Sequence, residues 1–192
     1  MKLKFENQAF QLQAIESTVN LFRGMQILEL TEQLANQNEI LSYDLVANGL
    51  QLNELQLLKN LQSIQLLNSL ENYATELYYG EYAFKRKDDA GNEIEPLIKI
   101  PNVSIEMETG TGKTYVYLRT AFELNKRYGL TKFIVVVPSD AIRAGVLKSL
   151  EITKEHFKSE YNNVSYDYYQ YDSEKISKVR DFATTNSIQI MV

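Results

Sequence analysis

Apolar residues in the second half of the chain form short runs that alternate with stretches of helical spacing. Residues 132–139 include consecutive Val and Ile positions, which predict a strand buried on both faces of a parallel sheet. Further strands are predicted at 164–171 and 187–192, and helices at 115–128, 141–157 and 173–184. This alternation predicts an α/β fold with a doubly wound parallel sheet.

The first half of the chain has a helical pattern instead. Leu12, Ile15, Val19 and Phe22 share one face of a helix predicted within residues 5–23. Residues 26–79 are rich in Leu, Gln, Asn and Glu, and their apolar stripe predicts a helical hairpin or short bundle with a break at 47–49. The stripe consists of Leu50, Leu57, Leu61, Ile64, Leu67, Leu70, Ala74 and Leu77. Internal packing is the simpler role for this stripe, and docking of a partner subunit is the alternative.

A β-hairpin is predicted between these halves. Residues 82–85 and 93–95 flank a segment with turn chemistry at 88–92, and the mixed charges near its tip indicate a solvated loop. Pro96 and Pro101 separate the hairpin from a further strand predicted at 102–107. The chain therefore divides into segments 1–25, 26–79, 80–101 and 102–192.

Residues 107–114, Met-Glu-Thr-Gly-Thr-Gly-Lys-Thr, lie between a predicted strand and a predicted helix. Two glycines allow the backbone N–H groups to surround an anion, and a Lys-Thr pair follows at the spacing of a Walker A motif. The general motif begins with a glycine where this chain has Met107, so the match is to the tighter T-G-T-G-K-T form. A glycine turn beside a chance lysine is the alternative, and the order of strand, loop and helix disfavours it.

Composition restricts the protein class. Hydrophobic residues make up 44% and charged residues 23%, as in a globular protein, and the absence of cysteine excludes disulfides and thiolate metal sites. A net charge of -5 argues against a surface covered in basic patches, although nucleic acid can also be contacted through backbone amides and hydroxyls. No signal-like segment or apolar run of membrane length is present, which predicts a cytoplasmic protein without membrane contact.

Individual polar side chains add smaller hypotheses. The carboxamide of Gln11 lies at a helix start and can read an adenine edge, although a solvated role is commoner for such a residue. Ser139 or Asp140 can cap the helix at 141–157, at the sheet edge where ligands bind in open α/β folds. The tyrosines of 164–171 fit either base stacking or ordinary strand packing, and the second role is favoured. His156 has no clear partner in the sequence, so no chemistry is assigned to it.

Three segments carry a family resemblance. Residues 10–15, 108–114 and 136–148 resemble the Q motif, motif I and motif Ia of superfamily 2 helicases. Within that superfamily, residues 107–119 and 138–157 most resemble the Res subunit of type III restriction-modification enzymes. The resemblance implies a partial RecA-like P-loop domain, with a parallel sheet flanked by helices, an N-terminal helical insertion and a β-hairpin. It also implies an ATP-dependent motor on double-stranded DNA and a modification (methyltransferase) subunit as partner.

The same resemblance implies residue roles. Gln11, with Phe10 nearby, would recognise adenine, and Lys113 and Thr114 would be catalytic, with Thr114 also holding Mg2+. The segment that would bind the ATP phosphates comprises Thr109, Gly110, Thr111, Gly112, Lys113 and Thr114. A DNA strand would be contacted by Pro138, Ser139 and Arg143.

The chain departs from the family pattern after its P-loop. The family needs an acidic D-E motif at a strand end and an arginine from a second lobe, whereas Glu174 and Asp181 lie on a predicted helix. We therefore expect an N-terminal fragment that ends inside the first motor lobe, binds nucleotide weakly and neither turns over ATP efficiently nor cuts DNA. The alternatives are another P-loop NTPase, such as a small-molecule kinase, and a non-catalytic subunit-interaction module.

Overall fold

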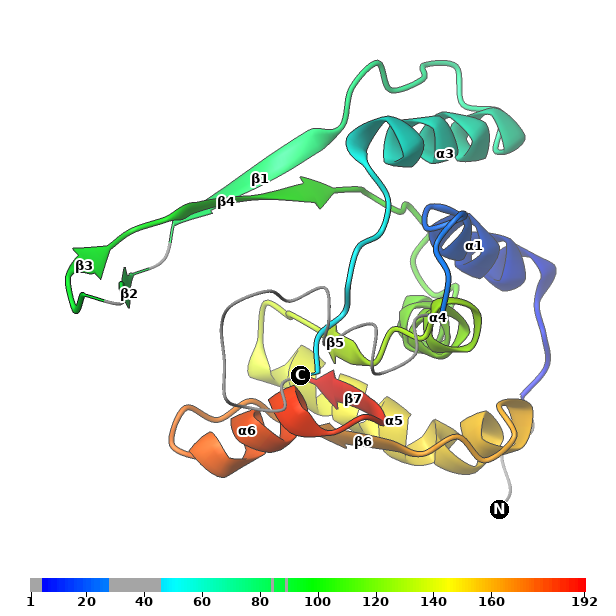
Figure 1. The fold of residues 1–192 in the computed structure, drawn as a ribbon. Coiled ribbons are helices and arrows are strands. Elements are labelled where there is room, and N and C mark those ends of the chain that lie inside the picture. Colours follow the sequence, from blue (N-terminus) through cyan, green and yellow to red (C-terminus); the bar gives the residue numbers. More distant parts are fainter. Residues whose placement is uncertain (1–4, 28–45, 84, 89) are drawn as a thin grey trace. The chain divides into compact units, whose positions relative to one another are not determined.

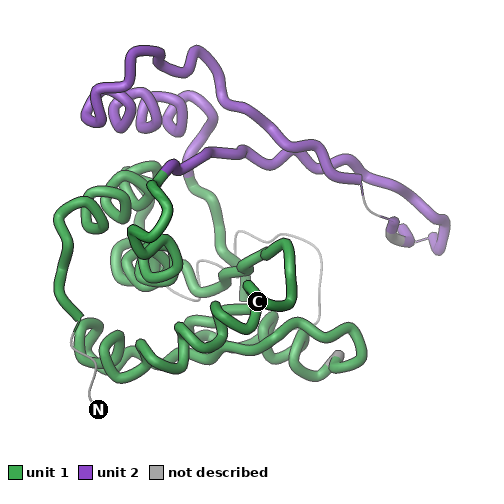
Figure 2. The backbone as a smooth tube through the Cα atoms, turned by 180° about the vertical axis from the view of Figure 1, so that it is seen from behind, with its two compact units in different colours: residues 1–51, 107–192 green, residues 52–106 purple. Residues whose placement is uncertain are grey.

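The computed structural model describes residues 5–27, 46–83, 85–88 and 90–192. The chain forms two compact units, one of residues 1–51 with 107–192 and the other of residues 52–106 (Figure 2). We refer to them as unit 1 and unit 2. Unit 1 contains both the glycine-rich loop and the predicted parallel sheet.

Unit 1 is built on a three-stranded parallel sheet in the order β5-β7-β6 (Figure 1). Its strands are β5 (Lys132–Ile134), β6 (Tyr166–Tyr169) and β7 (Ile188–Met191), and its helices are α1 (Ala9–Asn20), α4 (Lys113–Tyr128), α5 (Asp140–Glu160) and α6 (Ile176–Thr184). Ile134 of β5 and Tyr169 of β6 both pair with Met191, so the carboxyl ends of the strands are level. The predicted α/β fold with a parallel sheet flanked by helices is confirmed.

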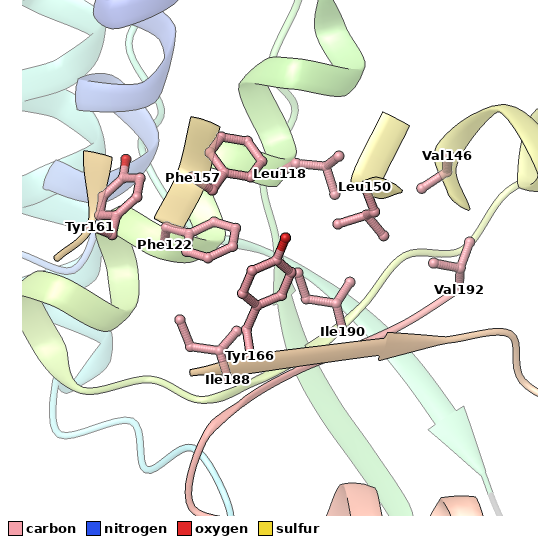
Figure 3. Close-up of a cluster of buried hydrophobic side chains, with 10 residues drawn as sticks. All are labelled: Leu118, Phe122, Val146, Leu150, Phe157, Tyr161, Tyr166, Ile188, Ile190 and Val192. Carbon is pink, nitrogen blue, oxygen red and sulfur yellow. The ribbon is translucent and has the colours of Figure 1, made fainter. Parts of the chain in front are cut away.

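The core of unit 1 joins α4, α5 and the sheet (Figure 3). The rings of Phe122 on α4 and Phe157 on α5 lie 4.6 Å apart, and the ring of Tyr166 on β6 meets Phe122 edge-on at 4.9 Å. All four residues of the central strand β7 are buried. Offset and edge-on ring contacts add to the stabilisation from area burial, so this cluster fixes α4 and α5 on the sheet.

Unit 1 confirms most of the predicted helices and strands. The helix after the glycine-rich loop ends at Gly129, whose φ of 72° is a left-handed conformation that glycine adopts readily. Ser139 caps α5, with its hydroxyl accepting a hydrogen bond from the Ile142 N–H at 3.4 Å. The helix predicted at 173–184 and the strands predicted at 164–171 and 187–192 are present in shorter form as α6, β6 and β7.

The predicted burial of residues 132–139 on both faces is wrong. Strand β5 ends at Ile134, which is 63% exposed, and Val136 is 89% exposed. Phe133, Val135 and Val137 pack against the core, whereas the alternate residues Ile134 and Val136 are exposed, so only one face of this segment is covered among the described residues. Strand β5 also pairs only with β7 among the described strands, so one edge of its backbone faces no strand.

The free side of β5 is instead occupied by the side chain of Asn48. Its carboxamide oxygen accepts hydrogen bonds from the N–H groups of Thr131 and Lys132 at 2.8 and 3.0 Å, and its amide nitrogen donates to the Lys132 carbonyl at 2.6 Å. One carboxamide therefore pairs with the outward-facing N–H and C=O of Lys132, as a neighbouring strand would.

The strand predicted at 102–107, directly before the glycine-rich loop, is also wrong. Strand β4 (Leu97–Asn102) ends at Asn102, and residues 103–108 have no regular structure. The ladder that β4 forms with β1 (Tyr78–Ala83) stops at the pair Tyr78 and Asn102. The alternating residues beyond Asn102 therefore meet no strand among the described residues, because alternation alone forms no ladder without a partner.

Unit 2 combines one helix with two antiparallel strand pairs. Helix α3 (Glu54–Leu67) begins with a capping box between Asn53 and Gln56, and β1 pairs with β4 over six residues. Strands β2 (Arg86–Lys87) and β3 (Glu93–Ile94) close the hairpin that the sequence predicts. Its turn is held by the Asp88 carboxylate, which accepts hydrogen bonds from the N–H groups of Ala90 and Asn92.

The helical hairpin predicted for residues 26–79 is only partly present. Residues 28–45 lie outside the described residues, and the described remainder contains the single helix α3. The stripe is also not continuous, because Leu57 is 4% exposed whereas Leu67, at the helix end, is 76% exposed. The chain turns at Ser69, whose φ of 56° is left-handed and incompatible with a continuing helix.

No helix among the described residues is long and apolar enough to cross a membrane.

Candidate nucleotide-binding site

The glycine-rich loop leads directly into α4. Gly110 and Gly112 have φ values of 82° and 83°, in the left-handed region that a Cβ disfavours. A Cβ placed on Gly110 would meet no atom within 4 Å, so the loop is open at this point. The Thr111 hydroxyl donates to the Glu108 carbonyl at 2.7 Å and closes the turn.

The loop and the first turn of α4 present a row of backbone donors. Among the described residues, the first N–H bonded along the helix is that of Val116, to the Gly112 carbonyl, so the N–H groups of residues 112–114 precede the helical ladder. Free N–H groups at a helix start, together with the positive end of the helix dipole, attract an anion. The open loop therefore fits a phosphate group.

Gln11 lies against this loop although it is 100 residues away in the chain. Its side-chain nitrogen donates to the Thr111 carbonyl at 2.8 Å. A Cβ on Gly112 would come within 2.5 Å of the same nitrogen, so the absence of a side chain there allows Gln11 to approach. The sequence reasoning grouped Gln11 with the loop only through the resemblance, and the geometry brings the two together.

Helix α1 is anchored to α4, which explains why Gln11 is held in place. Ile15 and Val19 of α1 pack with Val116 and Leu124 of α4 in a second buried cluster. At the far end of the contact, Arg127 forms a two-pronged ion pair with Glu16. The apolar face predicted for the first helix is thus the surface that packs against α4.

The remaining residues of the predicted nucleotide site differ in surroundings. Lys113 is exposed at the start of α4, and Phe10, on the first turn of α1, is 47% exposed. Burial raises the pKa of the Tyr117 phenol, and its side-chain hydrogen bond with Thr114 lowers that pKa by less.

The residues predicted to touch DNA lie at the start of α5. Pro138 and Ser139 are exposed after β5, and Arg143 forms a salt bridge with Asp140 at 3.0 Å. No hydrogen bond between described residues joins these three to the glycine-rich loop. They form a separate group at the carboxyl edge of the sheet.

One buried group near the site was missed by sequence reasoning. Arg119 on α4 is 5% exposed and donates to the Glu160 carboxylate at 2.7 Å, to the Tyr161 hydroxyl at 3.2 Å and to the Tyr115 hydroxyl at 3.0 Å. It also donates to the side chain of Asn7. This network joins the segment before α1 to α4 and α5. The available signal was an arginine within the apolar positions of a predicted helix, four residues after Tyr115.

His156 belongs to the same group, contrary to the expectation that it lacks a partner. Its Nε2 lies 2.8 Å from the Tyr115 hydroxyl, and its ring stacks on Phe5 at 4.6 Å. Burial lowers the pKa of His156; Glu160 raises it and Arg119 lowers it further. The partners come from α4 and from the segment before α1, so spacing in the sequence gave no sign of them.

Among the described residues no group of three or more His, Asp or Glu side chains is arranged to hold a metal ion. Asp181 lies on α6 as predicted, whereas Glu174 lies in the segment between β6 and α6 and not on a helix. Magnesium keeps several waters and commonly binds through one or two protein groups plus substrate phosphates. The donor that fits such a role in the loop is the Thr114 hydroxyl.

Comparison with known proteins adds an independent finding. The family model described as "Type III restriction enzyme, res subunit" matches residues 5–192. The chain is 32% identical over 159 residues to the EcoPI Res subunit of Escherichia phage P1, and 31% identical over 159 residues to the EcoP15I Res subunit of Escherichia coli. Each alignment covers 81% of this chain and 14% of the relative. No solved structure matches the chain significantly.

Proposed function

The chain belongs to the family of type III restriction enzyme Res subunits, and from this premise we propose that it binds ATP and Mg2+ as part of a DNA-dependent motor. The chain spans about a seventh of the length of the relatives, whose aligned share is 14%. The motor activity, the DNA and the partner subunit are therefore proposals for the whole protein, and the RecA-like assignment of unit 1 is part of the same proposal.

One observation carries the proposal, namely the contact between Gln11 and the glycine-rich loop. A carboxamide that donates to the Thr111 carbonyl at 2.8 Å has its oxygen left to accept a hydrogen bond, and a second N–H left to donate. An adenine edge offers one donor and one acceptor, which match this pair. The loop and Gln11 together support recognition of both ends of an adenine nucleotide, with Phe10 on the same first turn of α1.

Each loop residue has a role that its chemistry supports. Backbone N–H groups of Thr109, Gly110, Thr111 and Gly112 would surround the phosphates, and Lys113 would place its ammonium against the β and γ phosphates. The Thr114 hydroxyl would be a ligand of Mg2+, whose charge helps to neutralise the phosphates. Positioning and charge neutralisation are the main protein contributions to phosphoryl transfer.

We propose that turnover requires residues that the described part of the chain does not supply. No adjacent Asp-Glu pair follows a described strand after the loop, since Glu174 lies between β6 and α6 and Asp181 lies on α6. This chain would therefore bind nucleotide without efficient hydrolysis. The DNA-contacting residues would be Pro138, Ser139 and Arg143, and the partner a modification subunit, in a cytoplasmic enzyme without membrane contact.

The test is the binding of a fluorescent ATP analogue to this chain in the presence of Mg2+. Lys113→Ala is expected to reduce affinity at least tenfold, because it removes the ammonium that faces the phosphates. Gln11→Ala is expected to reduce the affinity for ATP more than for GTP, because the carboxamide reads the base. Lys126→Ala, at the opposite end of α4, is the matched control for loss of one positive charge.

Two outcomes contradict the proposal. If Lys113→Ala and Lys126→Ala bind nucleotide with equal affinity, the glycine-rich loop is not part of the nucleotide site. Efficient DNA-stimulated ATP hydrolysis by the 192-residue chain would show that no further acidic group is needed. Phosphoryl transfer to a small molecule would favour the kinase alternative instead.

A further inference from the structure

Helix α1 begins without the local groups that usually stabilise a helix start. Its N-cap residue, Gln8, makes no side-chain hydrogen bond to the helix, and no acidic residue lies in the first turn. By contrast, Asn53 caps α3 and Ser139 caps α5. Uncapped helix ends fray, so the first turn of α1, which carries Gln11, depends on contacts with other elements for its order.

The segment directly before α1 is held by side chains of α4 and α5. The ring of Phe5 stacks on the ring of His156, with 4.6 Å between their centres. The side-chain oxygen of Asn7 accepts a hydrogen bond from the guanidinium of Arg119. Asn7 lies two residues before Ala9, where α1 begins, so this hydrogen bond tethers the chain directly at the uncapped turn.

The guanidinium of Arg119 is a fixed donor for this tether. It is 5% exposed, and its nitrogens donate to four side chains, those of Tyr161, Glu160, Tyr115 and Asn7. The N–H groups of arginine form a rigid planar fork, so the guanidinium cannot turn away from Asn7 without breaking its bonds to α4 and to the end of α5. The position of the donor is therefore set by packed helices.

The tether and the candidate nucleotide site share one helix. Helix α4 starts at the glycine-rich loop and carries Arg119 in its first half, and α1 packs along it (Figure 1). The far end of α1 is held separately, by the ion pair of Glu16 with Arg127. Gln11 lies between that pair and the tether at Asn7, and reaches the loop from there.

From these observations we propose that the hydrogen bond between Asn7 and Arg119 orders the first turn of α1 and thereby positions Gln11 to select adenine over guanine. Both are positioning residues, because they act through Gln11 and not on the nucleotide itself. The inference rests on the proposed function, since it concerns the side chain that would read the base. Apparent affinity falls with the fraction of molecules whose site is ordered, so loss of the tether should weaken binding of the preferred base.

The test is Asn7→Ala, because Asn7 is exposed and its truncation leaves the buried bonds of Arg119 to α4 and α5 in place. Binding of fluorescent ATP and GTP analogues is measured in the presence of Mg2+. The affinity for ATP should fall about fivefold, as expected for one lost hydrogen bond to a charged group. The affinity for GTP should change less than about twofold, because guanine does not match the carboxamide in the same way.

Gln8→Ala is the matched control, since it removes the neighbouring exposed carboxamide, which makes no cap bond. It should retain the ratio of ATP affinity to GTP affinity. Asn7→Asp keeps an oxygen that can accept from the guanidinium, and should retain that ratio as well. The two variants together separate loss of the hydrogen bond from a general disturbance of the segment.

A second measurement needs no nucleotide. The N–H of Leu12 donates to the Gln8 carbonyl at 3.0 Å and closes the first turn of α1, so its hydrogen exchange reports the order of that turn. Exchange at Leu12 should be about fivefold faster in Asn7→Ala than in the unchanged chain, and unaltered in Gln8→Ala. A role in overall stability alone would shift the unfolding midpoint and leave the ratio of the two affinities unchanged.

The outcomes distinguish this inference from the proposed function. If Gln11→Ala lowers the ratio of ATP affinity to GTP affinity but Asn7→Ala does not, only the inference is overturned. Equal exchange at Leu12 in Asn7→Ala and in the unchanged chain would overturn it as well, whatever the nucleotide result. If Gln11→Ala itself leaves the ratio unchanged, base recognition by Gln11 is contradicted, and the inference falls with it.

Discussion

The two units stabilise their strands in opposite ways. In unit 1 the central strand β7 is buried along its whole length, and the side chains around it include Phe157 at 0% and Phe122 at 1% exposure. In unit 2 the ribbon of β1 and β4 has a complete ladder, yet Tyr78 is 74% and Leu97 57% exposed. Pairing of backbone groups and burial of side chains are therefore separate contributions in this protein.

The difference shows which part of the molecule can hold a site rigidly. A two-stranded ribbon is at best marginally stable by itself, whereas side chains locked by packing keep their geometry. The glycine-rich loop and Gln11 both belong to unit 1. We therefore expect substitutions to have larger effects in unit 1 than in unit 2.

The largest effect is predicted for Phe157→Ala. Removal of this fully buried ring from the contact with Phe122 should reduce the free energy of unfolding by about 3–5 kcal/mol. Tyr78→Ala in unit 2 is the matched aromatic truncation, and at an exposed position it should cost about 0.5 kcal/mol or less. Urea denaturation followed by circular dichroism measures the loss of unfolding free energy in both variants. Equal losses would contradict the expected difference between the two units.

A second effect concerns ion pairs. Arg119→Met should cost about 2 kcal/mol, because it removes the buried guanidinium and leaves Glu160 and the bonded hydroxyls without their donor. Lys99→Met breaks the exposed pair with Glu81 on the unit 2 ribbon and should cost less than about 1 kcal/mol. The same denaturation measurement applies, and a Lys99→Met cost as large as that of Arg119→Met would contradict the expectation.

A third effect compares helix caps, and here unit 2 is expected to be the more sensitive. Asn53→Ala removes the 2.9 Å bond in which the Asn53 side chain accepts from the Gln56 N–H, while the backbone N–H of residue 53 can still donate to the Gln56 side chain. The loss should cost about 1 kcal/mol. Ser139→Ala removes a single 3.4 Å bond at the start of α5 and should cost less. Hydrogen exchange of the first amides of each helix reports the two costs separately.

The smallest predicted effect is a difference between the two units in how a titrating side chain makes stability depend on pH. Burial lowers the pKa of His156 in folded unit 1 below its ordinary 6.5, so the unfolded chain binds more protons there. The stability from neutral His156 is present above pH 6.5 and is lost as the pH falls through the lower folded pKa. In unit 2 the hydrogen bond from the Asn92 backbone lowers the pKa of Asp88 below 3.8, so its contribution is lost only at more acidic pH.

The measurement is the unfolding midpoint between pH 7.5 and 5.5. The unchanged chain should lose stability in that window, and His156→Gln should lose less, since it has no group to protonate there. Asp88→Asn should leave the dependence in that window unchanged. If His156→Gln loses as much stability between pH 7.5 and 5.5 as the unchanged chain, groups other than His156 cause the loss.

The sequence predicted unit 1 better than unit 2, for physical reasons that particular residues illustrate. The helix after the loop, the cap at Ser139 and the stop at Gly129 are local signals, and each is confirmed. The burial of 132–139 could not be derived, because it depends on whether another element covers the second face of β5. The strand at 102–107 is absent for a different reason, since alternation specifies a face and not a pairing partner.

The candidate site, like the fold, has one part that the sequence could predict and another part that it could not. The loop was recognisable from seven consecutive residues, whereas the contact between Gln11 and the loop is visible only in the structure. The network of Arg119, Tyr115 and His156 was not recognisable, because its members come from α4, α5 and the segment before α1. The roles of Lys113, Thr114, Ser139 and Arg143 stay predictions.

Asn48 has a consequence that goes beyond the fold of one molecule. A strand edge with unpaired N–H and C=O groups is a template on which another chain can add a strand, and this is a common start of aggregation. The carboxamide of Asn48 occupies the outward N–H and C=O of Lys132. A single side chain thereby occupies the place that an added strand would take at Lys132.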